Sequence, residues 1–333
     1  MKIAIDAMGG DHAPEEIIKG AIDAAKAYPD TELILVGQES VVQESLRKNV
    51  SEMPPNIRIH HASEVMEMDE SVENLRKKRD SSIWVATQLV KDALADAVVS
   101  AGSTAAQMAT ATLLLKRIKG IDRPAISTVY PTLKGGKVIL DIGANTNIEP
   151  KQLVQFALMG KTYAEVILKI NNPRVALLSN GTEEAKGNEL VVEAHQLLKN
   201  ADLNFIGNIE GRDIPAGDYD VVVCDGFVGN VVLKLSEGLG QALFTLLKQE
   251  FTKDLRGKLG AALLMPGLKN IKKMMDYAEV GGAPLLGVKG VSIICHGSSK
   301  ARAIHNAVRV ARECVAGRFI EQVETSIHGE GGN

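Results

Sequence analysis

Short apolar runs alternate along the chain with longer stretches in which apolar residues recur every three or four positions. The short runs are rich in Val, Ile and Leu, which is typical of buried strands, whereas the longer periodic stretches are typical of amphipathic helices. The predicted strands cover residues 3–6, 33–36, 57–60, 97–100, 125–129, 138–141, 175–178, 205–207, 221–224 and 291–295. The predicted helices cover residues 14–28, 81–94, 104–117, 150–168, 184–198, 230–251 and 300–316.

The alternation of strands with helices predicts right-handed βαβ units around a largely parallel sheet. Ten strands exceed one modest domain, and 333 residues are enough for about two domains with a substantial core. We therefore expect an α/β fold built from αβα layers.

Most of the predicted strands end in glycine together with small polar or acidic residues. Taken singly, each of these ends is explained by ordinary turn chemistry. Because ligands of open parallel sheets collect beyond the carboxyl ends of the strands, the set as a whole predicts one large polar cleft. The candidate cleft residues are Asp6, Asp11, Ser103, Thr104, Asn145, Asn180, Asp225, Asn230, His296, Ser298 and Ser299.

Residues 281–300 are the most informative of these stretches. Four glycines and a proline lead into the apolar run 291–295, which ends at His296-Gly-Ser-Ser before a long helical pattern. This order predicts a strand, a tight turn and a helix with Ser298 or Ser299 as its N-cap. The first N–H groups of such a helix, together with its positive dipole end, favour a bound anion. An ordinary capped turn without a ligand is the alternative.

Composition narrows the classes of protein that fit. The net charge of −3 gives no global reason to expect a nucleic-acid partner, and the 45% apolar content suits a soluble α/β protein. Three widely spaced cysteines indicate neither a disulfide framework nor a zinc site, which fits a reducing cytoplasm. The chain opens directly on a strand pattern and has no apolar run of membrane-spanning length, so we expect neither a secretory leader nor a transmembrane segment.

No motif in the sequence predicts a metal or a nucleotide cofactor. His-Glu-x-x-His, Cys-x-x-Cys and Gly-x-Gly-x-x-Gly are all missing, and the neighbours His60 and His61 point to opposite faces of a strand. Cys224 and Cys295 lie at strand ends, so a covalent route through an acyl-cysteine intermediate has to be considered. Cys295 cannot pair with its neighbour His296 as thiol and imidazole, because their side chains alternate. We expect both cysteines to pack in the core.

Six longer motifs occur in order along the chain: Asp6-Ala-Met-Gly-Gly-Asp-His, Ser100-Ala-Gly-Ser-Thr-Ala-Ala, Leu140-Asp-Ile-Gly-Ala-Asn, Gly207-Asn-Ile-Glu-Gly-Arg-Asp, Asp225-Gly-Phe-Val-Gly-Asn and Gly281-Gly-Ala-Pro-Leu-Leu-Gly. Together they resemble the acyl-[acyl-carrier-protein]:phosphate acyltransferase family of bacterial phospholipid synthesis, from Met1 to about Ala316. One departure is that Ser103 and Ala105 stand where the family usually has Asn and Gly. Ser103 still provides a donor at the start of a helix.

The resemblance implies an enzyme that transfers a fatty acyl group from acyl carrier protein to inorganic phosphate, giving acyl phosphate for phosphatidic acid synthesis. It also implies a homodimer and a fold similar to phosphotransacetylase and, more remotely, isocitrate dehydrogenase. Two αβα three-layer domains would then flank a cleft, with residues 1–145 and 300–333 in the first domain and 146–299 in the second. The alternatives are a short-chain phosphate acyltransferase that uses acyl-coenzyme A, or a non-catalytic membrane-bound metabolite sensor.

Phosphate attacking a thioester needs no nucleophile from the protein, so the site mainly has to hold and align. We expect Ser103, Thr104, Ser298 and Ser299 to hold the phosphate. His296 is the candidate proton donor to the departing thiolate, or else it only caps the turn. Asp225 either takes a proton from phosphate, or fixes Asn230, Lys234 or His296, or only caps a helix.

The basic run 76–79 precedes a predicted helix start at Ser81 and Ser82. Arg76 and the two serines are candidates for binding phosphate, and the run as a whole could instead meet the carrier protein. A solvated surface is the alternative.

Residues 251–277 combine basic flanks with an apolar centre, and Pro266-Gly267 predicts a break into two short protruding helices with an apolar tip. Such a tip fits peripheral contact with the inner face of the cell membrane, with the carrier protein or with a downstream membrane acyltransferase, and the dimer interface is the alternative. The candidate contact residues are Leu259, Leu263, Leu264, Leu268, Lys269, Lys272 and Lys273.

Overall fold

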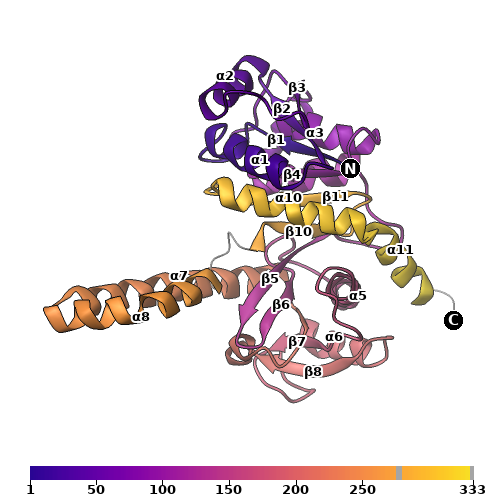
Figure 1. Ribbon diagram of the computed structural model, residues 1–333. Coiled ribbons are helices and arrows are strands. Elements are labelled where there is room, and N and C mark those ends of the chain that lie inside the picture. Colours follow the sequence, from indigo (N-terminus) through magenta and orange to yellow (C-terminus); the bar gives the residue numbers. More distant parts are fainter. Residues whose placement is uncertain (275–279, 331–333) are drawn as a thin grey trace.

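One sheet of eleven strands runs through the whole molecule, in the order β3-β2-β1-β4-β11-β10-β5-β6-β9-β7-β8. The computed structural model describes residues 1–274 and 280–330 (Figure 1). The strands are β1 (Lys2–Asp6), β2 (Glu32–Gly37), β3 (Ile57–His61), β4 (Ala97–Ser100), β5 (Ala125–Thr132), β6 (Gly135–Leu140), β7 (Val175–Ser179), β8 (Phe205–Glu210), β9 (Val221–Val223), β10 (Ala283–Leu286) and β11 (Val291–Ile294). All ten predicted strands are present, and the predicted α/β fold with a largely parallel sheet is confirmed.

Helices cover the sheet. They are α1 (Glu15–Ala27), α2 (Glu39–Asn49), α3 (Ser82–Lys91), α4 (Thr104–Leu114), α5 (Pro150–Val166), α6 (Glu189–Lys199), α7 (Gly226–Thr252), α8 (Leu255–Met274), α10 (Ala301–Ala316) and α11 (Phe319–Glu330), with the short 3₁₀ helices η1 (Val72–Arg76) and η2 (Gly211–Ala216). The sequence analysis missed α2 and α11. Among the described residues, no helix combines the length and the apolarity that crossing a bilayer requires.

In the N-terminal half, β3, β2, β1, β4 and β11 are parallel neighbours. Their side chains alternate between two apolar clusters because successive residues of a strand point to opposite faces. Ile3 and Ile5 pack with residues of α1 and α10, whereas Ala4 and Val98 pack with residues of α3 and α4. This half of the sheet is therefore the middle layer of three.

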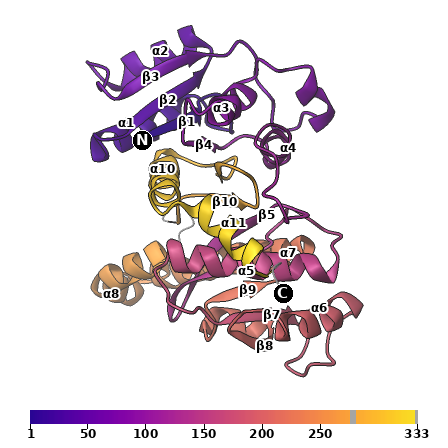
Figure 2. The same cartoon turned by 90° about the vertical axis from the view of Figure 1, so that its right-hand side faces the viewer.

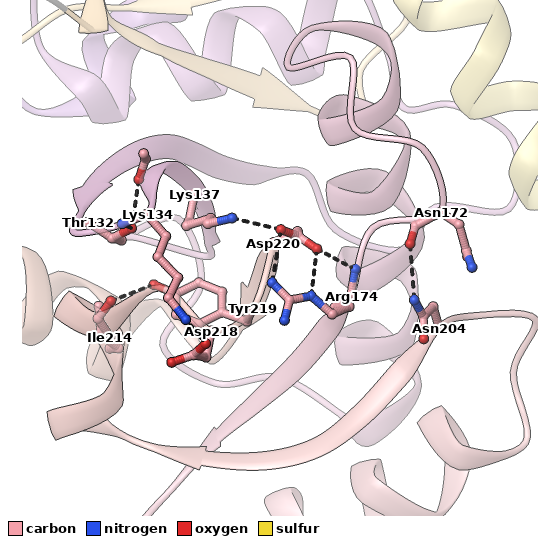
Figure 3. A network of polar contacts seen from close by, with 11 residues as sticks. Thr132, Lys134, Lys137, Asn172, Arg174, Asn204, Ile214, Asp218, Tyr219 and Asp220 are labelled. Carbon is pink, nitrogen blue, oxygen red and sulfur yellow. Dashed lines mark hydrogen bonds and ion pairs between the residues drawn. The ribbon is translucent and has the colours of Figure 1, made fainter.

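In the other half, β6, β9, β7 and β8 are parallel. α5 and α6 cover one face through residues such as Phe156 and Leu198, while the opposite face packs on Ile214 of η2 and on Tyr219. At the amino ends of these strands, Asp220 forms ion pairs with Lys137 (2.7 Å) and Arg174 (3.1 Å), as Figure 3 shows. This network fastens β6 to the segments that lead into β7 and β9.

The two halves meet at β10 and β5, which run antiparallel to their neighbours. No strand was predicted in residues 281–287, but they contain β10, which forms a hairpin with β11. Glycines with φ near 90° flank β10 at Gly281, Gly282 and Gly287. Because such glycines are typical of turns, the sequence pattern did not predict this strand.

The strand pairing crosses the expected domain limits. β11 pairs with β4 in the N-terminal half, although residues 291–294 were assigned to the second domain. β6 pairs with β9 in the other half, although residues 135–140 were assigned to the first domain. The crossing between the halves therefore falls at β5 and β10, and the division into two folding units remains a prediction.

α7 and α8 form a long hairpin that projects from the body (Figure 1). The predicted break at Pro266 is wrong, since α8 continues through it. The reversal lies at Lys253 and Asp254, where Asp254 Oδ1 accepts a hydrogen bond from Gly257 N–H (2.7 Å). A Cβ at Gly257 would lie 2.9 Å from the Phe251 carbonyl oxygen, so the close approach of the helices uses this glycine. The expected apolar tip is consequently polar. The predicted roles of Lys272 and Lys273 fall outside the described side chains.

Candidate active site

The carboxyl ends of β1, β4 and β11 lie side by side, because these strands are adjacent and parallel. The loops that follow them are joined by backbone hydrogen bonds. Asp11 N–H donates to the Gly297 carbonyl (2.8 Å), and Cys295 N–H donates to the Ser100 carbonyl (2.8 Å). The three strand ends that the sequence analysis singled out thus form one edge.

A cavity of about 380 Å³ opens beside this edge and is lined by both halves of the molecule. Five of the predicted site residues line it together: Thr104, Asn230, Lys234, His296 and Ser299. Its apolar lining includes Ile126, Ile142, Leu233 and Ile294. Figure 2 shows α4 and α7, which contribute from opposite sides of β5. The cavity thus combines polar groups from the start of α4, from α7 and from the loop after β11 with an apolar wall.

His296 is held by the turn that follows β11. Its Nδ1 accepts a hydrogen bond from Ser298 N–H (3.2 Å) and lies 2.8 Å from Ser298 Oγ. Because the backbone N–H can only donate, Nδ1 carries a lone pair, and the neutral imidazole has its proton on Nε2. The ring is exposed and lines the cavity, so it can present a donor there.

The predicted N-cap of α10 is wrong, and the geometry does not support the anion site expected at this helix start. The N-cap residue is Lys300, without a side-chain cap, and neither Ser298 nor Ser299 takes that position. Glu16 Oε2 instead accepts a hydrogen bond from Ala301 N–H (3.1 Å), and this bond lowers the pKa of Glu16. A carboxylate therefore already occupies the helix end and would repel a phosphate.

The start of α4 is the better anion site. Ser103 is its N-cap and accepts a hydrogen bond from Ala106 N–H (3.5 Å), whereas it was expected as a donor. Thr104 and Ala105 are exposed, and Thr104 lines the cavity. The first N–H groups of a helix have no partner within it, so this end can donate to an anion in the cavity.

Asp225 caps α7. Its Oδ1 accepts hydrogen bonds from Phe227 N–H and Val228 N–H, both at 2.9 Å. It lines a separate hollow of about 720 Å³ that also contains Arg123, so the structure does not bring it to His296. Helix capping was one of the three roles left open for Asp225, and it is the one that the geometry shows.

Asn230 and Lys234 lie one turn apart on the same face of α7 and both line the cavity. Lys234 Nζ forms an ion pair with Glu237 Oε2 (2.9 Å), another lining residue. The cavity therefore contains a cation whose position is set by α7 itself.

Two buried carboxyls shape the loops around the cavity. Asp6 accepts hydrogen bonds from Ser100 Oγ (2.7 Å) and Met8 N–H (3.2 Å). Burial raises the pKa of Asp6, and this effect outweighs the hydrogen bonds, which lower the pKa. Asp141 accepts from the N–H groups of residues 143, 144 and 145 and from the Asn145 amide. The sequence analysis missed Asp141 as a loop organiser, although a carboxyl at a strand end followed by glycine was a usable signal. Asp6 and Asn145 are thus structural.

The remaining candidates lie away from the cavity lining. Asn180 and Arg76 are exposed, and Asp11 is exposed beside Gly297. Ser81 and Ser82 are buried, with Ser81 Oγ donating to the Lys78 carbonyl (2.7 Å). The phosphate-binding roles predicted for Arg76, Ser81 and Ser82 have no support from the lining of the cavity.

The cysteines fit core packing. Cys224, Cys295 and Cys314 are buried and unpaired. Cys295 is among the residues that line the cavity, and burial raises its pKa to about 12, so its thiol is protonated at neutral pH. In the described residues, no three His, Cys, Asp or Glu side chains form a cluster that could hold a metal ion.

Known proteins show which family shares this architecture. The structure is similar to a phosphotransacetylase from Streptococcus pyogenes, with a TM-score of 0.65 at 21% identity over 96% of this chain and 94% of that one, which shows a common fold. A phosphate acyltransferase from Desulfitobacterium hafniense strain Y51 is 60% identical over 98% of this chain and 97% of its own length. The phosphate acyltransferase of Heliobacterium modesticaldum is 56% identical over 99% and 98%. A family profile described as fatty acid synthesis protein matches residues 1–322. The chain therefore belongs to the phosphate acyltransferases, a family of fatty acid synthesis enzymes.

Proposed function

We propose that this phosphate acyltransferase takes a fatty acyl group from the thioester of acyl carrier protein and transfers it to inorganic phosphate in the 380 Å³ cavity. The observation that carries the proposal is the cavity lining. Thr104, His296 and Lys234 offer donors for an anion, whereas Ile126 and Leu233 offer an apolar wall for an acyl chain. One cavity therefore fits both substrates of the reaction.

The chemistry needs alignment rather than a protein nucleophile. A phosphate oxygen attacks the thioester carbonyl carbon, the C–S bond breaks, and the leaving sulfur takes a proton. The first N–H groups of α4 hold the phosphate with the Thr104 hydroxyl, and Lys234 balances its charge. His296 donates a hydrogen bond from Nε2–H to the leaving sulfur, and the proton that this sulfur takes comes from the attacking hydrogen phosphate. Asn230 completes the donor set around the carbonyl oxygen.

The donor is tested by incubating the protein with acyl carrier protein thioester or acyl-coenzyme A, each with and without phosphate. We expect acyl phosphate to form from the carrier thioester only when phosphate is present. Efficient transfer from acyl-coenzyme A alone would instead show the short-chain type of phosphate acyltransferase. Binding of thioester without any turnover would favour a metabolite sensor.

Replacing Thr104 with leucine is expected to raise the KM for phosphate roughly tenfold, because a hydrogen bond to an anion contributes about 1.5 kcal/mol or more. Steady-state rates at varied phosphate concentration measure this. Thr112→Leu, the same change near the other end of α4, is the control and should leave the KM unchanged. Equal values in both variants would remove the start of α4 from the phosphate site.

The hairpin of α7 and α8 carries unpartnered leucines along its length. Leu235, Leu239, Leu243 and Leu246 lie within one narrow arc of α7, and Leu235 is 59% exposed. On α8, Leu263 is 83% exposed, and Leu259 and Leu264 are also exposed, whereas Leu268 is half-buried and Lys269 is exposed. A stripe along whole helices fits another helix better than insertion of a tip into lipid. We infer that a second copy of the chain covers it, which gives the homodimer. Contact with a membrane, with the carrier or with a membrane acyltransferase is the alternative.

Replacing Leu263 and Leu264 with glutamate is expected to convert the dimer into monomers, measured by sedimentation velocity. Gln241→Glu, on the opposite side of α7, is the control and should remain dimeric. If the leucine changes leave the dimer intact and release the protein from anionic vesicles, the stripe is a membrane surface instead.

A further inference from the structure

The loop between α4 and β5 carries an unusual concentration of positive charge. Residues 116–123 contain four cationic side chains and one carboxylate, Asp122, and Lys289 of the β10–β11 turn lies against them, while the whole chain has a net charge of −3. Lys289 N–H donates to the Lys116 carbonyl (2.9 Å), which fixes this contact. We call residues 116–123 with Lys289 the basic loop; Figure 2 shows where α4 leads into β5.

The cations of the basic loop are not neutralised by neighbouring carboxylates. In the described residues, Lys116, Lys119, Arg123 and Lys289 are exposed and none forms an ion pair. The only carboxylate of the loop, Asp122, is paired with Lys151 of α5 (3.1 Å). The surface therefore presents net positive charge to solvent.

The basic loop is held in place from both sides. Ile118 N–H donates to the Gly287 carbonyl (2.9 Å), and the Gln155 side chain of α5 binds both Asp122 N–H (3.0 Å) and the Gly120 carbonyl (2.9 Å). The loop lines a hollow of about 510 Å³. A prearranged surface loses little conformational freedom on binding, so its charges are available to a partner at low entropic cost.

The position of the basic loop connects it to the cavity. Arg123 precedes Ile126, a lining residue, by three positions, which is about 10 Å of extended chain. The exposed side chain of Leu113 adds an apolar contact one turn before the cations (42% exposed). A partner bound here would lie close enough to deliver a group on a flexible arm to the cavity.

We propose that the acyl donor docks on the basic loop. This donor is an acidic carrier protein that presents its acyl thioester on a flexible arm. The proposal rests on the function proposed above. Fixed positive charge, one apolar contact and closeness to the cavity suit an acidic folded partner. A nucleic acid is disfavoured because residues 112–123 contain no aromatic side chain for stacking.

The other basic run of the chain does not have these properties. Residues 64–80 contain six carboxylates against four cations, and Lys78 is already paired with Glu70 (2.7 Å). Arg76 and Lys77 are exposed and have no ion pair among the described residues. They therefore provide a matched control for charge reversal away from the basic loop.

The test compares Lys119→Glu/Lys289→Glu with Arg76→Glu/Lys77→Glu, using three measurements: the KM for acyl carrier protein thioester, the KM for phosphate, and the KM for an acyl pantetheine thioester that lacks the protein. We expect the first pair to raise the carrier KM ~10-fold or more and to leave the other two constants unchanged, because removing steering charge slows association. Added salt should raise the wild-type carrier KM and reduce the difference. The control pair should behave as wild type.

An unchanged carrier KM in the Lys119/Lys289 variant overturns the proposal, as does an equal rise with the pantetheine thioester. Lys119→Gln/Lys289→Gln, a milder change, should give an intermediate carrier KM and replaces the glutamate pair if that pair does not fold. Wild-type protein that makes no acyl phosphate from the carrier thioester would contradict the proposed function itself. Wild-type activity with unaffected variants would contradict only the docking surface.

Discussion

Replacing His296 with alanine is expected to lower kcat by ~10²-fold or more, because removing one hydrogen-bond donor from a charge that develops in the transition state typically costs that much. The imidazole lines the cavity, and Ser298 N–H at Nδ1 directs its remaining proton to Nε2. Without it, negative charge develops on the leaving sulfur with no hydrogen bond from His296 to stabilise it. The KM for phosphate should change little, since the start of α4 provides the phosphate contacts. Steady-state kinetics with carrier thioester and phosphate measure both constants.

Two further variants make this expectation specific. His296→Gln keeps an N–H donor on a side chain of similar length and should recover part of the lost rate. Asp225→Asn keeps the cap on α7 and should retain turnover within several-fold, because Asp225 lies in a different hollow. A folded His296→Ala protein with near-normal kcat would show that His296 only stabilises the turn after β11.

Removing the Asp220 carboxylate is expected to destabilise the fold by about 3–5 kcal/mol, the usual cost of leaving a buried charge without its partner. Lys137 is only 7% exposed, and its Nζ lies 2.7 Å from Asp220 Oδ1 (Figure 3). Arg174 Nε donates to the other oxygen, Oδ2 (3.1 Å). Urea-induced unfolding of Asp220→Ala against wild type measures the difference in free energy of unfolding.

The matched double variant Lys137→Met/Asp220→Leu replaces the buried charges with apolar side chains of similar size. Such replacements are often close to neutral, so this protein should be more stable than Asp220→Ala. A single Asp220→Ala change that costs less than about 1 kcal/mol would show that the pair is effectively solvated.

The same carboxylate makes stability depend on pH in the acid range. Burial alone would raise the pKa of Asp220, but hydrogen bonds from Arg174 and Lys137 outweigh it and hold the pKa at about 2, below the ordinary value of 3.8. A depressed native pKa stabilises the fold above the unfolded pKa, and this stabilisation, about 2 kcal/mol, is lost as the pH falls from about 4 to about 2. The stability difference between wild type and Asp220→Asn should shrink over that interval.

Local patterns were sufficient for most of the sheet. The alternation of apolar residues in β1 and β4 and the polar residues at their ends predicted both the parallel order and the edge at which the cavity lies. One cavity is lined by Ser299, His296 and Thr104. This too was predictable, because ligands of parallel sheets bind at the carboxyl ends of the strands.

The errors arose where distant residues decide the outcome. Glu16 caps α10 although 285 positions separate it from Ala301, so the turn sequence alone could not reveal that the helix end is occupied. β10 exists because β11 and β5 pair on either side of it, and its flanking glycines resemble a loop. The hairpin reverses at Asp254 and Gly257 instead of at Pro266, and α8 continues through Pro266.

The central claim is that phosphate is held in the cavity between the two halves, at the start of α4 and beside His296. A crystal structure of the protein grown with inorganic phosphate and an unreactive acyl thioester analogue tests it most directly. We predict a phosphate within hydrogen-bond distance of the Thr104 N–H and His296 Nε2 beside the thioester position of the analogue, with the acyl chain along Ile126 and Leu233. Phosphate bound instead in the hollow of Arg123 and Asp225, with the cavity beside His296 empty, would contradict the account.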